Sequence, residues 1–122
     1  MLLVWRRSAL AVPDQLGLTV DARAHLNTLV GKTIHTIGQG RPNRIVAIDG
    51  AGVVVATLQS PNGQRIAIAE VQAAMDMLER TRDLLIDKKI VGYRSAFIGA
   101  VLATLPGAVV STRPRRVRLE RP

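Results

Sequence analysis

The chain has no cysteine, and its 122 residues include only two histidines and three aromatic side chains. The absence of cysteine excludes disulfide bonds and thiolate metal sites, and it fits a reducing cytoplasm. A zinc centre would have to combine His25 and His35 with carboxylates, which is uncommon. The chain is long enough for one domain with a hydrophobic core. This core must be aliphatic, because the only aromatic residues are Trp5, Tyr93 and Phe97.

Acidic residues are also few: nine oppose 17 basic ones, which gives a formal net charge of +8. Fourteen of the basic residues are arginine, whose guanidinium group binds phosphate and guanine bidentately. GC-rich codons are the alternative explanation for so much arginine. Half of the net charge, +4, lies in the last ten residues. Candidate nucleic-acid-binding residues there are Arg113, Arg115, Arg116 and Arg118.

The charge and the hydrophobic pattern together predict three regions. Residues 1–18 form an N-terminal arm, residues 19–111 a single domain, and residues 112–122 a basic tail. Such a tail is usually disordered and often rests on a polyanion.

Residues 38–68 predict a three-stranded β-meander, because β-branched residues fill the strands between two turns. Asp49-Gly50 is typical of a type I′ hairpin, and Ser60-Pro61-Asn62-Gly63 of a second tight turn. The continuous apolar run of residues 53–55 predicts a central strand covered on both faces. The predicted fold class is therefore α+β, with a small antiparallel meander sheet covered by about three helices.

Those helices are predicted at residues 20–30, 69–82 and 95–105. Thr19 is the expected cap of the first helix and Ser95 of the last. The spacing of apolar residues gives the second helix a clear buried face, made by Val71, Ala74, Met75 and Leu78. Further short strands are expected at 33–37, 84–86 and 108–110.

The segment 38–44, GQGRPNR, precedes the first meander strand and is a candidate recognition loop. Arginine and asparagine are the residue types that contact guanine and adenine edges bidentately. Arg41, Asn43 and Arg44 are therefore candidate nucleic-acid-binding residues, and we expect them to be exposed. On this interpretation Asn43→Ala or Arg44→Ala costs specific binding about 1–3 kcal/mol and leaves the fold intact. An ordinary solvated turn is the alternative.

A second candidate segment lies at the start of the last predicted helix. Tyr93, Arg94 and Ser95 stand where a helix N-terminus presents free N–H groups to an anion. Arg94 can pair with phosphate, and Tyr93 can stack on a base or donate a hydrogen bond. A plain capping segment, with Tyr93 partly in the core, is the alternative.

Other functions find little support in the sequence. Residues 95–112 carry no charge, but eighteen residues are the lower limit for a membrane span and Pro106-Gly107 interrupts them. Asp87-Lys88-Lys89 matches half of a nuclease metal site, with no second carboxylate placed to complete it. The glycine-rich loop lacks the lysine and hydroxyl of a Walker motif. We predict no catalytic residues, no metal, no cofactor and no membrane contact.

Three stretches carry a family resemblance: GKTIHTIGQGRPNRIVAIDGAGVVVATLQSPNG, AEVQAAMDMLE and VGYRSAFIGAVLATLPGA. They resemble the non-catalytic N-terminal domain that precedes the HNH nuclease module in actinobacterial McrA-like restriction endonucleases. The resemblance covers roughly residues 26–110. It implies a domain that recognises target DNA, often modified DNA, and places Arg41, Asn43, Arg44 and residues 92–95 within it. No HNH module follows in this sequence.

We therefore expect a cytoplasmic, non-catalytic DNA-binding domain linked to restriction or phage defence. Its partners would be duplex DNA, modified or not, and a nuclease subunit on another chain. The alternative is a protein-interaction or structural subunit whose basic tail docks on an acidic partner.

Overall fold

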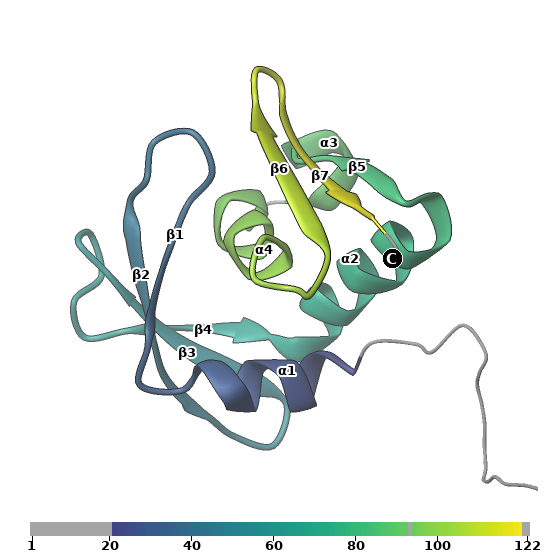
Figure 1. Cartoon of the computed structure of the whole chain (residues 1–122). Helices are drawn as coiled ribbons and strands as arrows, with labels where there is room; N and C mark the ends of the chain where they lie inside the picture. The colour runs from purple at the N-terminus through teal and green to yellow at the C-terminus, as the bar shows by residue number, and fades with distance from the viewer. Residues whose placement is uncertain (1–20, 93, 121–122) are drawn as a thin grey trace, which may run out of the picture.

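The computed structural model describes residues 21–92 and 94–120. These residues form four helices and seven strands (Figure 1). In chain order they are α1 (Ala22–Leu29), β1 (Thr33–His35), β2 (Pro42–Ile48), β3 (Gly52–Thr57), β4 (Gln64–Ala67), α2 (Ile68–Thr81), β5 (Asp83–Leu85), α3 (Lys88–Val91), α4 (Ser95–Leu102), β6 (Ala108–Thr112) and β7 (Arg115–Leu119). The strands pair into two antiparallel sheets, β1-β2-β3-β4 and β5-β7-β6. The predicted α+β class is confirmed, whereas the arm at residues 1–18 and the cap at Thr19 lie outside the described residues.

The predicted meander forms strands β2 to β4, and β1 extends it into a four-stranded sheet. Val53 and Val55 of β3 are fully buried and Val54 is half-buried, so the sheet is covered mainly on one face. Gly63 has φ +93°, as the second predicted turn requires. The type I′ prediction for the first turn is wrong, because Gly50 does not have positive φ; instead the Asp49 carboxylate accepts hydrogen bonds from the amides of Ala51 and Gly52.

The helices predicted at residues 20–30 and 69–82 are confirmed as α1 and α2, and both cover the inner face of this sheet. Helix α1 begins after Asp21, whose carboxylate accepts hydrogen bonds from the amides of Arg23 and Ala24. Its apolar residues Ala22, Leu26 and Leu29 are buried, whereas Val30, which lies past the helix end, is exposed. Helix α2 buries every residue of its predicted face.

The predicted basic tail is wrong for residues 112–119, which belong to a β-hairpin. Strand β7 is the central strand of the second sheet, pairing with β5 on one side and β6 on the other. Val117 faces the core and is fully buried. The sequence RRVRL alternates arginine with apolar residues, and a two-residue period places the arginines Arg116 and Arg118 on the solvent face of the strand.

Helix α4 lies between the two sheets (Figure 1) and contacts both β1 and β7. All its residues from 97 to 102 are buried. A Cβ atom on Gly99 would lie 2.8 Å from Ile86 Cγ2 and 3.6 Å from Ile37 Cδ1, so glycine allows the helix to fit there. Helix α4 has eight residues, and no described helix is long and apolar enough to cross a membrane.

Because β7 is central, we expect Val117→Ala to lower the free energy of unfolding by about 2–3 kcal/mol, through lost apolar burial and the cavity left behind. Val109 of β6 makes the same substitution available at a site that is 39% exposed, and there Val109→Ala should change stability by less than about 0.5 kcal/mol. Urea unfolding measures both. Equal effects would contradict the placement of β7 at the centre of the sheet.

Candidate nucleic-acid interface

The loop between β1 and β2 is a closed, internally bonded hairpin end. The Thr36 amide donates to the Arg41 carbonyl (3.0 Å), and the Arg41 amide donates to Thr36 Oγ1 (2.9 Å). Gly38 and Gly40 have φ of +90° and +66°, values that glycine adopts without strain. The hydrogen bonds and the glycines therefore define the backbone conformation of the predicted recognition loop. The exposed Arg41 side chain lies in this loop, at one end of the four-stranded sheet.

This loop lies beside the end of the β6–β7 hairpin. A Cβ atom on Gly38 would be only 3.3 Å from Arg115 Cδ, so the Arg115 side chain rests against the Gly38 backbone. We call residues 36–41 and 112–115 the two hairpin tips. Figure 1 shows both hairpins extending to the same side of the molecule, with α4 between them. Arginines more than 70 positions apart in the sequence are thus brought to one edge of the domain.

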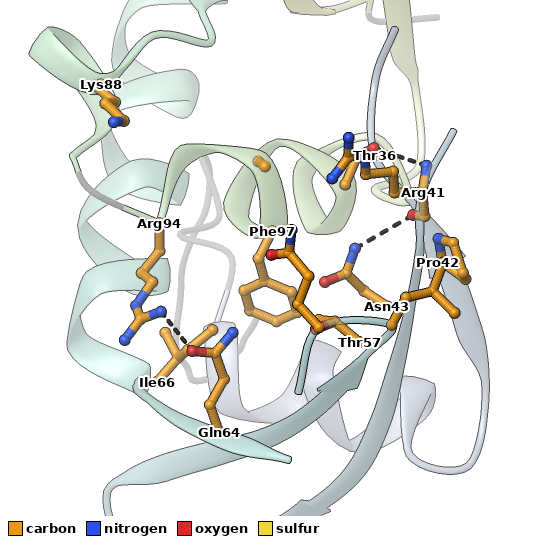
Figure 2. A pocket seen from close by; sticks show the side chains of 13 residues that line it. Thr36, Arg41, Pro42, Asn43, Thr57, Gln64, Ile66, Lys88, Arg94 and Phe97 are labelled. Atoms are coloured by element: carbon orange, nitrogen blue, oxygen red, sulfur yellow. Dashed lines mark hydrogen bonds between the residues drawn. The ribbon is translucent and has the colours of Figure 1, made fainter. Parts of the chain in front are cut away.

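A cavity of about 370 Å³ opens beside the first hairpin tip, at the start of α4. We call it the Asn43 pocket. Figure 2 shows Asn43, Phe97 and Gln64 around it, with Lys88 and Arg94 on one side and Arg41 on the other. It is lined by Thr36, Arg41, Pro42, Asn43, Thr57, Leu58, Gln59, Gln64, Ile66, Lys88, Arg94, Ala96 and Phe97. Among the described residues, the lining has three cationic side chains and no carboxylate, so it favours an anionic ligand.

The expectation that Asn43 is exposed is wrong. Asn43 is 6% exposed, and its Nδ2 donates to the Arg41 carbonyl at 3.3 Å. Alternation along β2 turns Asn43 to the same face as the buried Ile45. The side chain therefore lies on the inner face of the sheet, where it lines the pocket, and does not project from a surface loop.

The second predicted segment also reaches the pocket, through one residue. Arg94 is half-buried, and its Nη1 donates to Gln64 Oε1 at 2.6 Å (Figure 2). Ser95 does not line the pocket, and its predicted capping role is wrong: Arg94 is the N-cap residue, with no side-chain cap hydrogen bond. Tyr93 lies outside the described residues.

The remaining predicted arginines fall into two groups. Arg113 and Arg115 are exposed at the second hairpin tip. Arg116 and Arg118 face away from it and are ion-paired, Arg116 with Asp83 at 3.1 Å and Arg118 with Glu120 at 2.7 Å. Arg44 is exposed on the sheet face opposite to Asn43 and does not line the pocket. The structure therefore brings together Arg41, Asn43 and Arg94, with Arg113 and Arg115 on the neighbouring hairpin.

Of the pocket residues, the sequence predicted only Arg41, Asn43 and Arg94, and the residues that it missed include Thr57, Gln64 and Phe97. A signal for two of them exists, because Thr57 and Gln64 stand two positions from the buried Val55 and Ile66 on their own strands. The two-residue period puts them on the core face, where polar side chains are unexpected. Phe97 has no such signal, since its place in an apolar helix predicts only core packing.

A second hollow, between α1, the end of α2 and residues 105–107, has a different character. Its lining includes the carboxylates of Asp21, Glu79 and Glu120 together with His25 and Arg82. Burial lowers the pKa of His25, which leaves its imidazole neutral at neutral pH. This mixed, partly acidic lining suits a polyanion less well than the Asn43 pocket does. In the described part of the chain, no three or more His, Asp or Glu side chains are arranged so that they could hold a metal ion.

Comparisons with known proteins add no relative: no protein-family model, curated protein or solved structure matches the chain. The resemblance to the N-terminal domain of McrA-like endonucleases therefore stays a prediction. The candidate interface rests on the geometry of the two hairpin tips and the Asn43 pocket.

The placement of Asn43 predicts an effect on stability opposite in sign to the usual one for a core residue. Asn43→Leu keeps the side-chain volume roughly constant, exchanges one long hydrogen bond for apolar burial, and should raise the free energy of unfolding by about 1 kcal/mol. The exposed Arg44→Ala should change it by less than about 0.5 kcal/mol. Thermal and urea unfolding measure both. A loss above about 1 kcal/mol for Asn43→Leu would show instead that its bond to Arg41 is a structural requirement.

Proposed function

We propose that this protein is a non-catalytic DNA-binding domain that holds duplex DNA with its two hairpin tips. The observation that carries the proposal is the contact between Arg115 and Gly38, which unites arginines from two separate sheets on one edge. Clustered arginines on one side of a domain are the electrostatic footprint of nucleic-acid binding. Phosphate contacts from such side chains would position the duplex.

The charges at the hairpin tips are available to a ligand. Among residues 21–92 and 94–120, no carboxylate lies within ion-pair distance of Arg41, Arg113 or Arg115. In contrast, Arg116 and Arg118 already have carboxylate partners on the other face of β7. Unpaired arginines gain more from a phosphate, because binding does not first require an internal ion pair to break.

The order of elements in the second half supports the proposal but suggests an unusual contact mode. Helix α2 is followed by β5, the helix pair α3–α4 and the β6–β7 hairpin, with strand order β5-β7-β6. Two helices in succession also make up a helix-turn-helix motif, in which the second helix enters the major groove. Here that helix is α4, and its burial between the sheets keeps it from a groove. The hairpins remain as the contacting elements.

We extend the proposal to restriction or phage defence, with a nuclease on another chain, only through the family resemblance of the sequence. A DNA target would place the protein in the cytoplasm. The geometry of the hairpin tips is compatible with modified and unmodified duplexes alike, because phosphate contacts do not depend on the bases.

A protein-interaction module is the second candidate, and one observation favours it. Strand β6 is an edge strand, and its Val109 and Val110 are 39% and 40% exposed. An open edge with apolar side chains is suited to strand addition by a partner chain. Purification of the chain with a tight protein partner and without nucleic acid would favour this candidate over DNA binding.

Loss of the second hairpin tip tests the DNA-binding proposal. Arg113→Ala/Arg115→Ala should weaken binding to all duplexes alike and flatten the slope of log K against log salt by about 1.8, or about 0.9 for each lost phosphate contact. Fluorescence anisotropy at several salt concentrations measures both quantities. Arg116→Ala/Arg118→Ala removes the same net charge from the opposite face of β7 and is the matched control.

We expect the control to keep most of the parental affinity and nearly the parental salt slope. Equal losses in the two double variants would mean that net charge, not the hairpin tip, drives binding. The proposal is overturned if the parent binds no duplex, modified or unmodified, at about 50 mM salt, where phosphate contacts are strong.

A further inference from the structure

The Asn43 pocket contains a buried acceptor to which no described residue donates a hydrogen bond. Asn43 is 94% buried, and its amide nitrogen is held by the Arg41 carbonyl. Within the described part of the chain, its Oδ1 accepts no hydrogen bond. A carbonyl left in this way costs free energy on burial, so such atoms usually bind water or a ligand. Asn43 Oδ1 is therefore an acceptor in the pocket lining to which a ligand can donate a hydrogen bond.

Gln64 provides a donor from β4, two strands away from Asn43 in the same sheet. Its Oε1 is taken by Arg94, and a guanidinium group can only donate, so the amide orientation is fixed. The Gln64 Nε2 group is left to donate. The same logic fixes Asn43, because the Arg41 carbonyl can only accept. The pocket thus offers one acceptor and one donor whose orientations are both set by neighbouring groups.

The rest of the lining suits a flat, partly apolar ligand with a negative charge. Phe97 and Ile66 give apolar walls, and the volume of about 370 Å³ is in the usual range for small-ligand sites. Arg41, Lys88 and Arg94 supply positive charge around it (Figure 2). The eight-residue helix α4 begins beside the pocket and adds the positive end of its dipole.

We propose that the Asn43 pocket takes a single nucleobase unstacked from DNA, with its phosphate against Arg41, Lys88 and Arg94. Each base carries hydrogen-bond donors and acceptors along its edges, and Asn43 Oδ1 can accept from a base donor while Gln64 Nε2 can donate to a base acceptor. Enzymes and domains that bind an extruded base hold it by such edge contacts and by apolar or aromatic walls. This inference rests on the proposed DNA-binding function and adds a site that the hairpin tips do not supply.

Side-chain amide signals of the ¹⁵N-labelled protein test the pocket directly. We expect each of the four deoxynucleoside 5′-monophosphates to shift the NH₂ signals of Asn43 and Gln64. Inorganic phosphate alone should leave the Asn43 signal nearly unchanged and should shift the Gln64 signal, through Arg94, less than the nucleotides do. Equal shifts with phosphate would overturn the inference and show a simple anion site. No shift with any ligand would overturn it too, leaving water as the occupant.

Two variants locate the binding. Ala96→Phe fills the pocket from an exposed position at the start of α4 and should weaken mononucleotide binding at least tenfold. Ala73→Phe places the same ring at an exposed position on α2 outside the lining, and should change binding less than twofold. Asn43→Leu should lower the affinity for nucleotides to that for inorganic phosphate. Parental affinity in both Ala96→Phe and Asn43→Leu would contradict the inference.

A duplex carrying 2-aminopurine separates this inference from the proposed function. We expect its fluorescence to rise when the parent binds, and to stay low when Ala96→Phe binds the same duplex. Anisotropy on the same samples reports binding independently of base extrusion. Duplex binding without a fluorescence rise, and without amide shifts, would remove the inference and leave the DNA-binding function in place. Amide shifts without duplex binding would remove the function instead.

Discussion

The close packing of α4 between the two sheets holds the whole domain together. Gly99 fits where a Cβ atom would lie 2.8 Å from Ile86 Cγ2, and Ile37 closes the other side. Because Ile37 belongs to the β1–β2 loop and Ile86 follows β5, this one contact fixes the two sheets relative to each other. The position of the two hairpin tips beside each other depends on this contact. The position of the Asn43 pocket at the start of the helix depends on it too.

The same packing explains why the functional side chains lie on strands and loops. A helix that is buried on every side presents no face to a ligand, so α4 contributes only its first turn to the pocket. The inner face of the four-stranded sheet extends past that turn. Its core side chains Ile45, Val55 and Ile66 are followed by Asn43, Thr57 and Gln64 along the strands. Polar groups thus occupy the part of the core face that lines the pocket.

At the arginine-rich end of the chain, the high charge makes a strand difficult to predict from composition. Its composition predicts a solvated tail, yet Val117 and Leu119 alternate with Arg116 and Arg118 at the period of a strand. Arginine tolerates the solvent face of a sheet, because its head remains in water and its stem covers apolar surface. Two of the arginines then pair with Asp83 and Glu120, which leaves less free charge than the sequence count indicates.

The sequence by itself determined the local elements: the helical periods around Leu26 and Leu78, the β-branched strands, the turn at Gly63 and the excess of arginine. The helices, the strands and the turn depend on residues no more than four positions apart, and the excess of arginine follows from composition alone. Tertiary structure alone decided the burial of Asn43, the pairing of Gln64 with Arg94, the contact of Arg115 with Gly38 and the central place of β7. The last three depend on segments 30 or more positions apart, for which local sequence patterns carry no signal. Alternation along β2 places Asn43 on the face of Ile45, but only the packing of the other elements decides that this face is buried.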